Sequence, residues 1–131
     1  MAVTQLAPAR STGYQIVTYL RAPLSFNDGV TGVVQVGTLP AGALVLRTYA
    51  VITTAFNATG NTMKIGTVAS DASFGTGIST AAAGVITGGT ALATSTTVAP
   101  TVDTPVIATY TSTGSGTAGA GWVVVEYLPM P

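Results

Sequence analysis

The side chains that could carry out acid–base chemistry are few in this chain. It has no His and no Cys, which excludes imidazole bases, thiol nucleophiles and thiolate metal ligands. The remaining candidates are four carboxylates, Asp28, Asp71, Asp103 and Glu126, which lie far apart in sequence. A glycosidase would need two of them on either side of one bond. Because three fall in predicted loops, we interpret them as solvated turn residues and predict no catalytic site.

Three other motifs could bind a ligand or be modified, and each has a simpler structural explanation. The segment Gly114–Gly119 matches G-x-G-x-x-G, but a dinucleotide site requires a helix after the glycines, and here a valine-rich run follows. Asn57-Ala58-Thr59 is a glycosylation sequon inside a predicted turn. Asp71 with Ser73, or Asp103 in its loop, offers too few oxygens for calcium. We therefore expect no cofactor and no metal.

Aromatic side chains are the last candidates for ligand binding. A sugar-stacking platform could draw on Tyr110, Trp122 or Tyr127, as in a carbohydrate-binding β-sandwich. Aromatic residues in strands more often pack in a core or in a protein interface. Carbohydrate binding therefore stays as an alternative function and is not the leading one.

The low content of charged residues reduces the number of possible functions further. Only 6% of the residues are charged, against about a quarter in an ordinary soluble domain, while 47% are hydrophobic. The net charge is zero and the four basic residues are scattered, so the basic surface that nucleic-acid binding requires is missing. The uncharged stretch 72–102 is rich in Thr, Ser and Gly, and we expect no membrane span in it. This composition favours a protein that packs against other protein.

The elements that must position these residues are predicted to be strands. β-Branched residues dominate, helix formers are rare, and turn clusters recur about every 8–12 residues, which is typical of a sandwich or barrel. The longest run, Ala43–Phe56, alternates so that Leu46 shares one face with Leu44, while Val45 and Arg47 share a mixed, half-exposed face. The expected strands are 14–20, 33–39, 43–56, 62–67, 91–98, 105–110 and 122–128.

The strand pattern is clear in the last of these runs and weak in the middle of the chain. Residues 122–128 contain no polar side chain before Glu126, which predicts a central strand covered on both faces. Between Ser70 and Gly89 the pattern weakens, and Ala81–Ala83 is predicted to be a helical turn or a lid. We predict an all-β protein, an antiparallel β-sandwich of about eight strands with jelly-roll topology. Residues 1–13 are predicted to be an extended N-terminal arm and residues 14–131 a single domain.

A series of turns and strands also carries a family resemblance. Leu39–Val45 holds a Pro-Ala-Gly turn before the long strand, Thr53–Asn57 ends that strand, and Ile65-Gly66-Thr67 and Gly121–Pro129 follow. Over residues 31–131 this series resembles small structural proteins of tailed bacteriophages, especially jelly-roll capsid decoration (cement) proteins. The resemblance implies a homodimer or homotrimer that joins the outside of an icosahedral shell and clamps its major capsid subunits against DNA pressure.

The expected partners are therefore the major capsid protein and further copies of this chain, with no nucleic acid and no membrane. The N-terminus lacks the pattern of a signal peptide, and we expect synthesis in the bacterial cytoplasm and a final place on the outer capsid surface. An arm around Ala2–Arg10 is either a clamp that adds to a neighbour's sheet edge or a frayed terminus. The residues expected to contact a partner are Val3, Leu6, Arg10, Arg21, Arg47 and Tyr49.

Two alternatives remain beside this hypothesis. A head-fibre, tail or spike component of the virion belongs to the same class. A carbohydrate-binding module belongs to another class, and a carboxylate-based glycosidase ranks after it.

Overall fold

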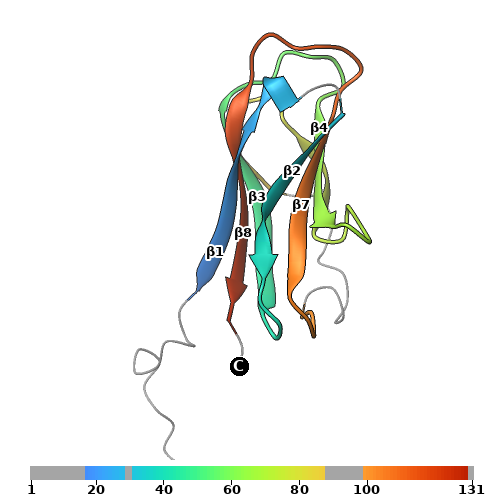
Figure 1. The fold of residues 1–131 in the computed structure, drawn as a ribbon. Coiled ribbons are helices and arrows are strands. Elements are labelled where there is room, and N and C mark those ends of the chain that lie inside the picture. Colours follow the sequence, from blue (N-terminus) through green and yellow to red (C-terminus); the bar gives the residue numbers. More distant parts are fainter. Residues whose placement is uncertain (1–16, 29–30, 88–98, 130–131) are drawn as a thin grey trace, which may run out of the picture.

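The computed structural model describes residues 17–28, 31–87 and 99–129, which form two stacked β-sheets (Figure 1). Sheet A has the strand order β1-β8-β3-β6 and sheet B the order β2-β7-β4-β5. A single turn of 3-10 helix, Phe26–Asp28, joins β1 to β2. The strands are β1 Thr18–Ser25, β2 Thr31–Leu39, β3 Leu44–Thr54, β4 Thr62–Thr67, β5 Gly75–Ser79, β6 Gly84–Thr87, β7 Thr104–Thr111 and β8 Ala120–Leu128.

The strand pairing is nested. β1 pairs with β8, β2 with β7, β3 with β6 and β4 with β5, all antiparallel, and successive pairs alternate between the two sheets. A long hairpin rolled up on itself produces this order, which is the jelly-roll arrangement. The prediction of an eight-stranded antiparallel β-sandwich is confirmed. The predicted arm over 1–13 and the predicted strand over 91–98 lie outside the described residues.

Alternation along each strand builds the core between the sheets. In β8, Val123 and Val125 are buried and point inward, and β8 lies centrally between β1 and β3, as its sequence predicts. Tyr110 of β7 is among the largest buried side chains, and its ring centroid lies 5.1 Å from that of Phe56. Burial of such apolar surface supplies most of the stabilisation of a sandwich.

Buried hydrogen bonds fix one end of the core. The Tyr110 hydroxyl donates to Asn61 Oδ1 at 2.6 Å, and Asn61 Nδ2 donates to the carbonyl oxygens of Phe56, at 3.0 Å, and of Ala58. The Phe56 N–H donates to the Thr80 carbonyl oxygen at 2.9 Å. These bonds join β7, the turn after β3 and the segment after β5.

Two sequence predictions for β3 and its surroundings are wrong in detail. The register of β3 against β8 shifts between Val45 and Arg47, so Val45 is 2% exposed and Leu46 is 37% exposed, the reverse of the predicted faces. A β-bulge places one extra residue on a strand and thereby inverts the alternation beyond it. Ala81–Ala83 form exposed bends between β5 and β6 and are neither a helical turn nor a lid over the core.

Candidate interaction surface

The outward side chains of sheet A line up in three rows, because residues paired across antiparallel strands point to the same face. We call these eleven residues the outer face of sheet A. The rows are Tyr19, Glu126 and Arg47; then Arg21, Val124, Tyr49 and Thr87; then Pro23, Trp122, Val51 and Val85.

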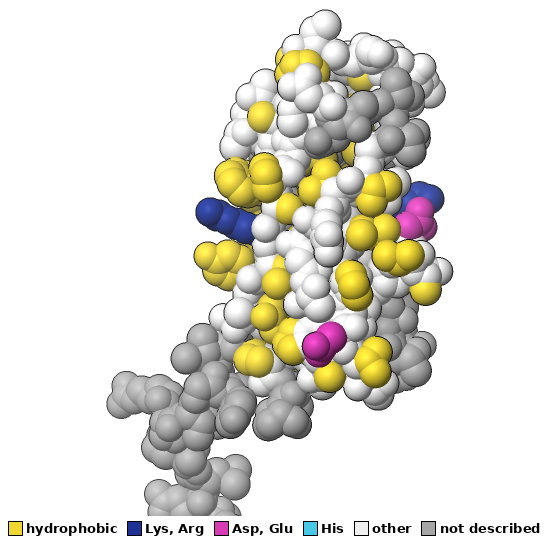
Figure 2. Space-filling model, in the orientation of Figure 1, with side chains coloured by type: hydrophobic (Ala, Val, Ile, Leu, Met, Phe, Trp, Pro, Cys, Tyr) yellow, Lys and Arg dark blue, Asp and Glu magenta, His cyan; other side chains and the backbone are white. Residues whose placement is uncertain are grey.

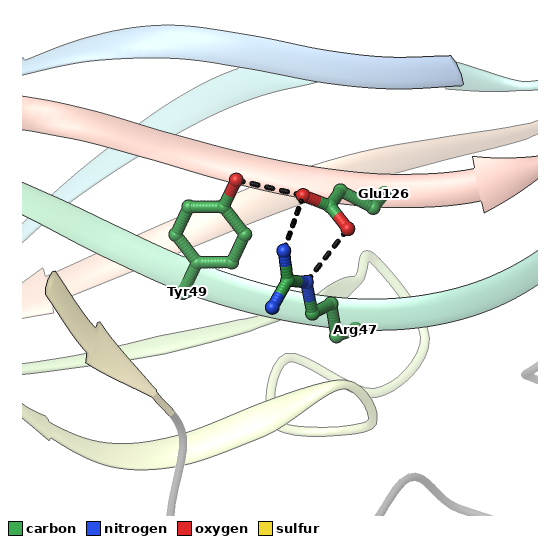
Figure 3. Close-up of polar contacts among 3 residues, drawn as sticks. All are labelled: Arg47, Tyr49 and Glu126. Atoms are coloured by element: carbon green, nitrogen blue, oxygen red, sulfur yellow. Dashed lines mark hydrogen bonds and ion pairs between the residues drawn. The ribbon is translucent and has the colours of Figure 1, made fainter. Parts of the chain in front are cut away.

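Glu126 is the centre of a hydrogen-bonded cluster on this face (Figure 3). Nε and Nη2 of Arg47 donate to its two carboxylate oxygens at 2.6 and 3.0 Å, and the Tyr49 hydroxyl donates to Oε1 at 2.9 Å. The hydrogen bond from Arg47 holds the pKa of Glu126 below its ordinary value. The hydrogen bonds to Glu126 likewise raise the pKa of Arg47 and the pKa of Tyr49. The charges of Arg47 and Glu126 are thus matched within the face.

Arg21 contrasts with Arg47, because no acidic side chain among the described residues pairs with it. Its guanidinium carbon lies 4.4 Å from the centroid of the Trp122 ring, a cation–π contact. Arg21 is exposed, and Trp122 is 36% exposed. Tyr19 and Val85, on the same face, are 58% and 67% exposed. The outer face of sheet A therefore combines open aromatic and apolar surface with one cation that is not neutralised.

The outer face of sheet B is chemically different. One of its rows, Thr111, Thr62 and Ser79, consists of short hydroxyl-bearing side chains, and the next row is Val33, Thr109 and Lys64. Its cation, Lys64, has Nζ 3.5 Å from Asp71 Oδ2, and both side chains are about half exposed. No described side chain on this face is aromatic. Since Tyr, Trp and Arg are the residues enriched at binding hot spots, the outer face of sheet A is the better candidate for contact.

The structure brings together half of the residues predicted to contact a partner. Arg21, Arg47 and Tyr49 lie on the outer face of sheet A, in two adjacent rows. The other three, Val3, Leu6 and Arg10, lie outside the described residues.

Sequence reasoning missed Trp122 and Glu126 as members of this face. It placed them in a strand covered on both sides, whereas the outer side of β8 carries a partly open Trp122. The signal was present as an alternation of Trp122, Val124 and Glu126 along the strand. Only the pairing of β8 with β1 and β3 sets these residues beside the arginines.

The other sequence candidates do not assemble into a site. Tyr110 and Tyr127 are 2% and 8% exposed, so they cannot form an open sugar platform with Trp122. The described carboxylates have separate partners. Glu126 accepts hydrogen bonds from Arg47, Asp71 lies near Lys64, and Asp103 Oδ1 accepts a hydrogen bond from the Ala41 N–H at 2.9 Å. The side chain of Asp28 is not among those described.

The asparagine of the sequon is hydrogen-bonded to the glycine-rich motif. The motif occupies the connection between β7 and β8, and a strand follows it, as predicted. Asn57 Oδ1 accepts the N–H groups of Thr117 and Ala118 at 2.9 and 3.1 Å, while Asn57 Nδ2 donates to Thr117 Oγ1 at 2.9 Å. Gly119 has φ +149° and lies so close to the Phe56 ring that a Cβ would collide with it. The Asn57 amide of the sequon is thus engaged in holding a loop.

Within residues 17–28, 31–87 and 99–129 there is no pocket and no group of three or more acidic side chains that could hold a metal ion. In the same residues no helix has the length and hydrophobicity needed to cross a membrane. Figure 2 shows the surface from one side, with hydrophobic side chains spread across it and only a few charged ones between them.

Comparison with known proteins gives a match of fold. No family model matches the chain, and no curated protein matches it. Among solved structures, the chain is similar to a chain of the "Cyanophage Pam1 capsid asymmetric unit", with a TM-score of 0.58 and 18% sequence identity. The match covers 98% of this chain and 94% of the other, so the two chains share one fold almost from end to end.

Proposed function

We propose that this chain is a structural protein of a bacteriophage virion, a decoration protein that binds the outside of the capsid shell and stabilises it. The observation that carries this proposal is the fold match, over almost the whole length of both chains, to a chain of a cyanophage capsid asymmetric unit. The chain acts by binding, and its partners are the major capsid protein and further copies of itself.

The outer face of sheet A supports the same proposal. It carries Tyr19, Tyr49, Trp122 and two arginines, and aromatic residues and Arg are enriched in protein interfaces. The segment around residues 2–10 is proposed as an additional clamp on a neighbouring subunit, and self-association as a dimer or trimer would multiply weak contacts by avidity.

The test is binding to shells that lack the protein. Expanded, DNA-filled capsids produced without this chain are mixed with purified protein and sedimented, and the temperature of DNA release is recorded. We expect saturable co-sedimentation and a higher release temperature. Absence of both effects would refute the proposal. Binding to purified tails in place of heads would assign the chain to the tail or fibre class.

A further inference from the structure

We propose that the outer face of sheet A is seated on the capsid shell and that the shell presents a carboxylate to Arg21 beside the Trp122 ring. This inference rests on the proposed function and deepens it by giving the chemistry of the partner surface. The partner is an acidic segment of the shell protein with apolar residues around its acid.

The first step is that Arg47 has an acidic partner on this face, whereas Arg21 has none among the described residues. Arg47 makes two hydrogen bonds to Glu126, at 2.6 and 3.0 Å, so its charge is already matched. Arg21 lies over Trp122 and has no acid among the described residues. Covering this face by any partner would remove Arg21 from water, which costs free energy unless the partner supplies an anion. The complementary surface is therefore acidic at this point.

The second step is the surroundings of Arg21. Through the pairing of β1 with β8 and of β8 with β3, its row continues to Val124 and Tyr49, and the neighbouring row holds Pro23 and Trp122. Apolar and aromatic neighbours exclude water from an ion pair once the face is covered. The cation–π contact with Trp122 does not use up the N–H donors of Arg21, whose forked arrangement matches a carboxylate. Trp122 thus holds Arg21 ready for such a partner.

The third step weighs a second copy of this chain as the occupant. The face has one described carboxylate, Glu126, and both of its oxygens already accept hydrogen bonds. Two such faces in contact would bury two Arg21 cations with no described carboxylate free to pair with them. A shell protein can present the missing carboxylate, so the shell protein is the favoured occupant.

The experiment measures binding of full-length variants to expanded shells that lack the protein. Arg21→Glu is compared with Lys64→Glu, which makes the same change in net charge on the outer face of sheet B. We expect Arg21→Glu to lower the shell affinity by about tenfold or more, because a desolvated charge pair is replaced by repulsion. Lys64→Glu is expected to change the affinity by less than about twofold, because exposed charges contribute little.

Two further variants separate charge from folding. Arg21→Lys keeps the charge and is expected to retain more affinity than Arg21→Gln, with circular dichroism and thermal unfolding confirming that each variant is folded. Wild-type binding is expected to weaken with added salt more steeply than binding of Arg21→Gln.

The outcomes distinguish the two proposals. If wild-type protein does not bind shells, the proposed function fails and this inference fails with it. If wild-type protein binds but Arg21→Glu and Lys64→Glu bind equally well, only the inference is overturned. If Arg21→Glu leaves shell binding intact but changes the sedimentation coefficient of the free protein, the occupant is a second copy, which also overturns it.

Discussion

The buried hydroxyl of Tyr110 offers a direct test of how the sandwich is held together, through the change Tyr110→Phe. The hydroxyl donates to Asn61 Oδ1 at 2.6 Å, and the two residues are 2% and 6% exposed. Phenylalanine keeps the ring and its packing against Phe56, so the change removes one hydrogen bond and leaves a buried acceptor without a partner. Such an acceptor costs about 1–3 kcal/mol. We expect this loss in the free energy of unfolding, and a fall in Tm of about 4 °C for each kcal/mol.

Urea denaturation gives the free energy, and a double-mutant cycle with Asn61→Ala gives the coupling. In the Asn61→Ala background the Tyr110 hydroxyl has already lost its acceptor, so Tyr110→Phe should cost almost nothing there. Tyr127→Phe is the matched control, since this ring is 8% exposed and its hydroxyl makes no hydrogen bond to the described residues. Equal losses for Tyr110→Phe with and without Asn61, or a loss no greater than that of the control, would refute the reasoning.

Two other predictions concern the loop at one end and the charged cluster on sheet A. Asn57→Ala removes the acceptor of the N–H groups at 117 and 118. Hydrogen exchange at these two amides should therefore become faster, and the free energy of unfolding should fall by about 1 kcal/mol. Unchanged exchange at both amides would contradict the role of Asn57. The pKa of Glu126 is lowered in the folded state from its ordinary 4.5, so its charge stabilises the fold above about pH 4.5, and this contribution is lost as the pH falls through the lowered value. The Tm advantage of the wild type over Glu126→Gln should therefore shrink on acidification, and an advantage that is the same at neutral pH and at about pH 3 would count against it.

Local patterns in the sequence are sufficient to predict many of the strands and turns of the sandwich. The run 62–67 alternates Met63 and Ile65 with Lys64, and it folds as β4 with those bounds, because side chains alternate across a strand whatever its partner. The turn residues Pro40, Ala41 and Gly42 end β2 where they were expected to. Periodicity and turn chemistry are local properties, so they can be read before any pairing is known.

Other elements depend on their partners. β5 and β6 are short and contain Gly75, Gly77 and Gly84, so they lack the periodicity that marks a strand, and their pairing with β4 and β3 makes them strands. The bulge that turns Leu46 outward and Val45 inward arises in the register of β3 against β8. Neither feature has a local signature in the sequence.

The sequence by itself determined that this chain is a β-protein with few charges and with neither His nor Cys, because composition and alternation are local. It also predicts that Arg21, Arg47 and Tyr49, together with Val3, Leu6 and Arg10, contact a partner. The tertiary structure decided that Arg21, Arg47 and Tyr49 share one face and that Glu126 neutralises Arg47 across 79 positions of sequence. It also placed Arg21 over Trp122, with no acidic partner among the described residues. The reason is that strand order and register set which distant residues become neighbours, and these are properties of the whole sandwich.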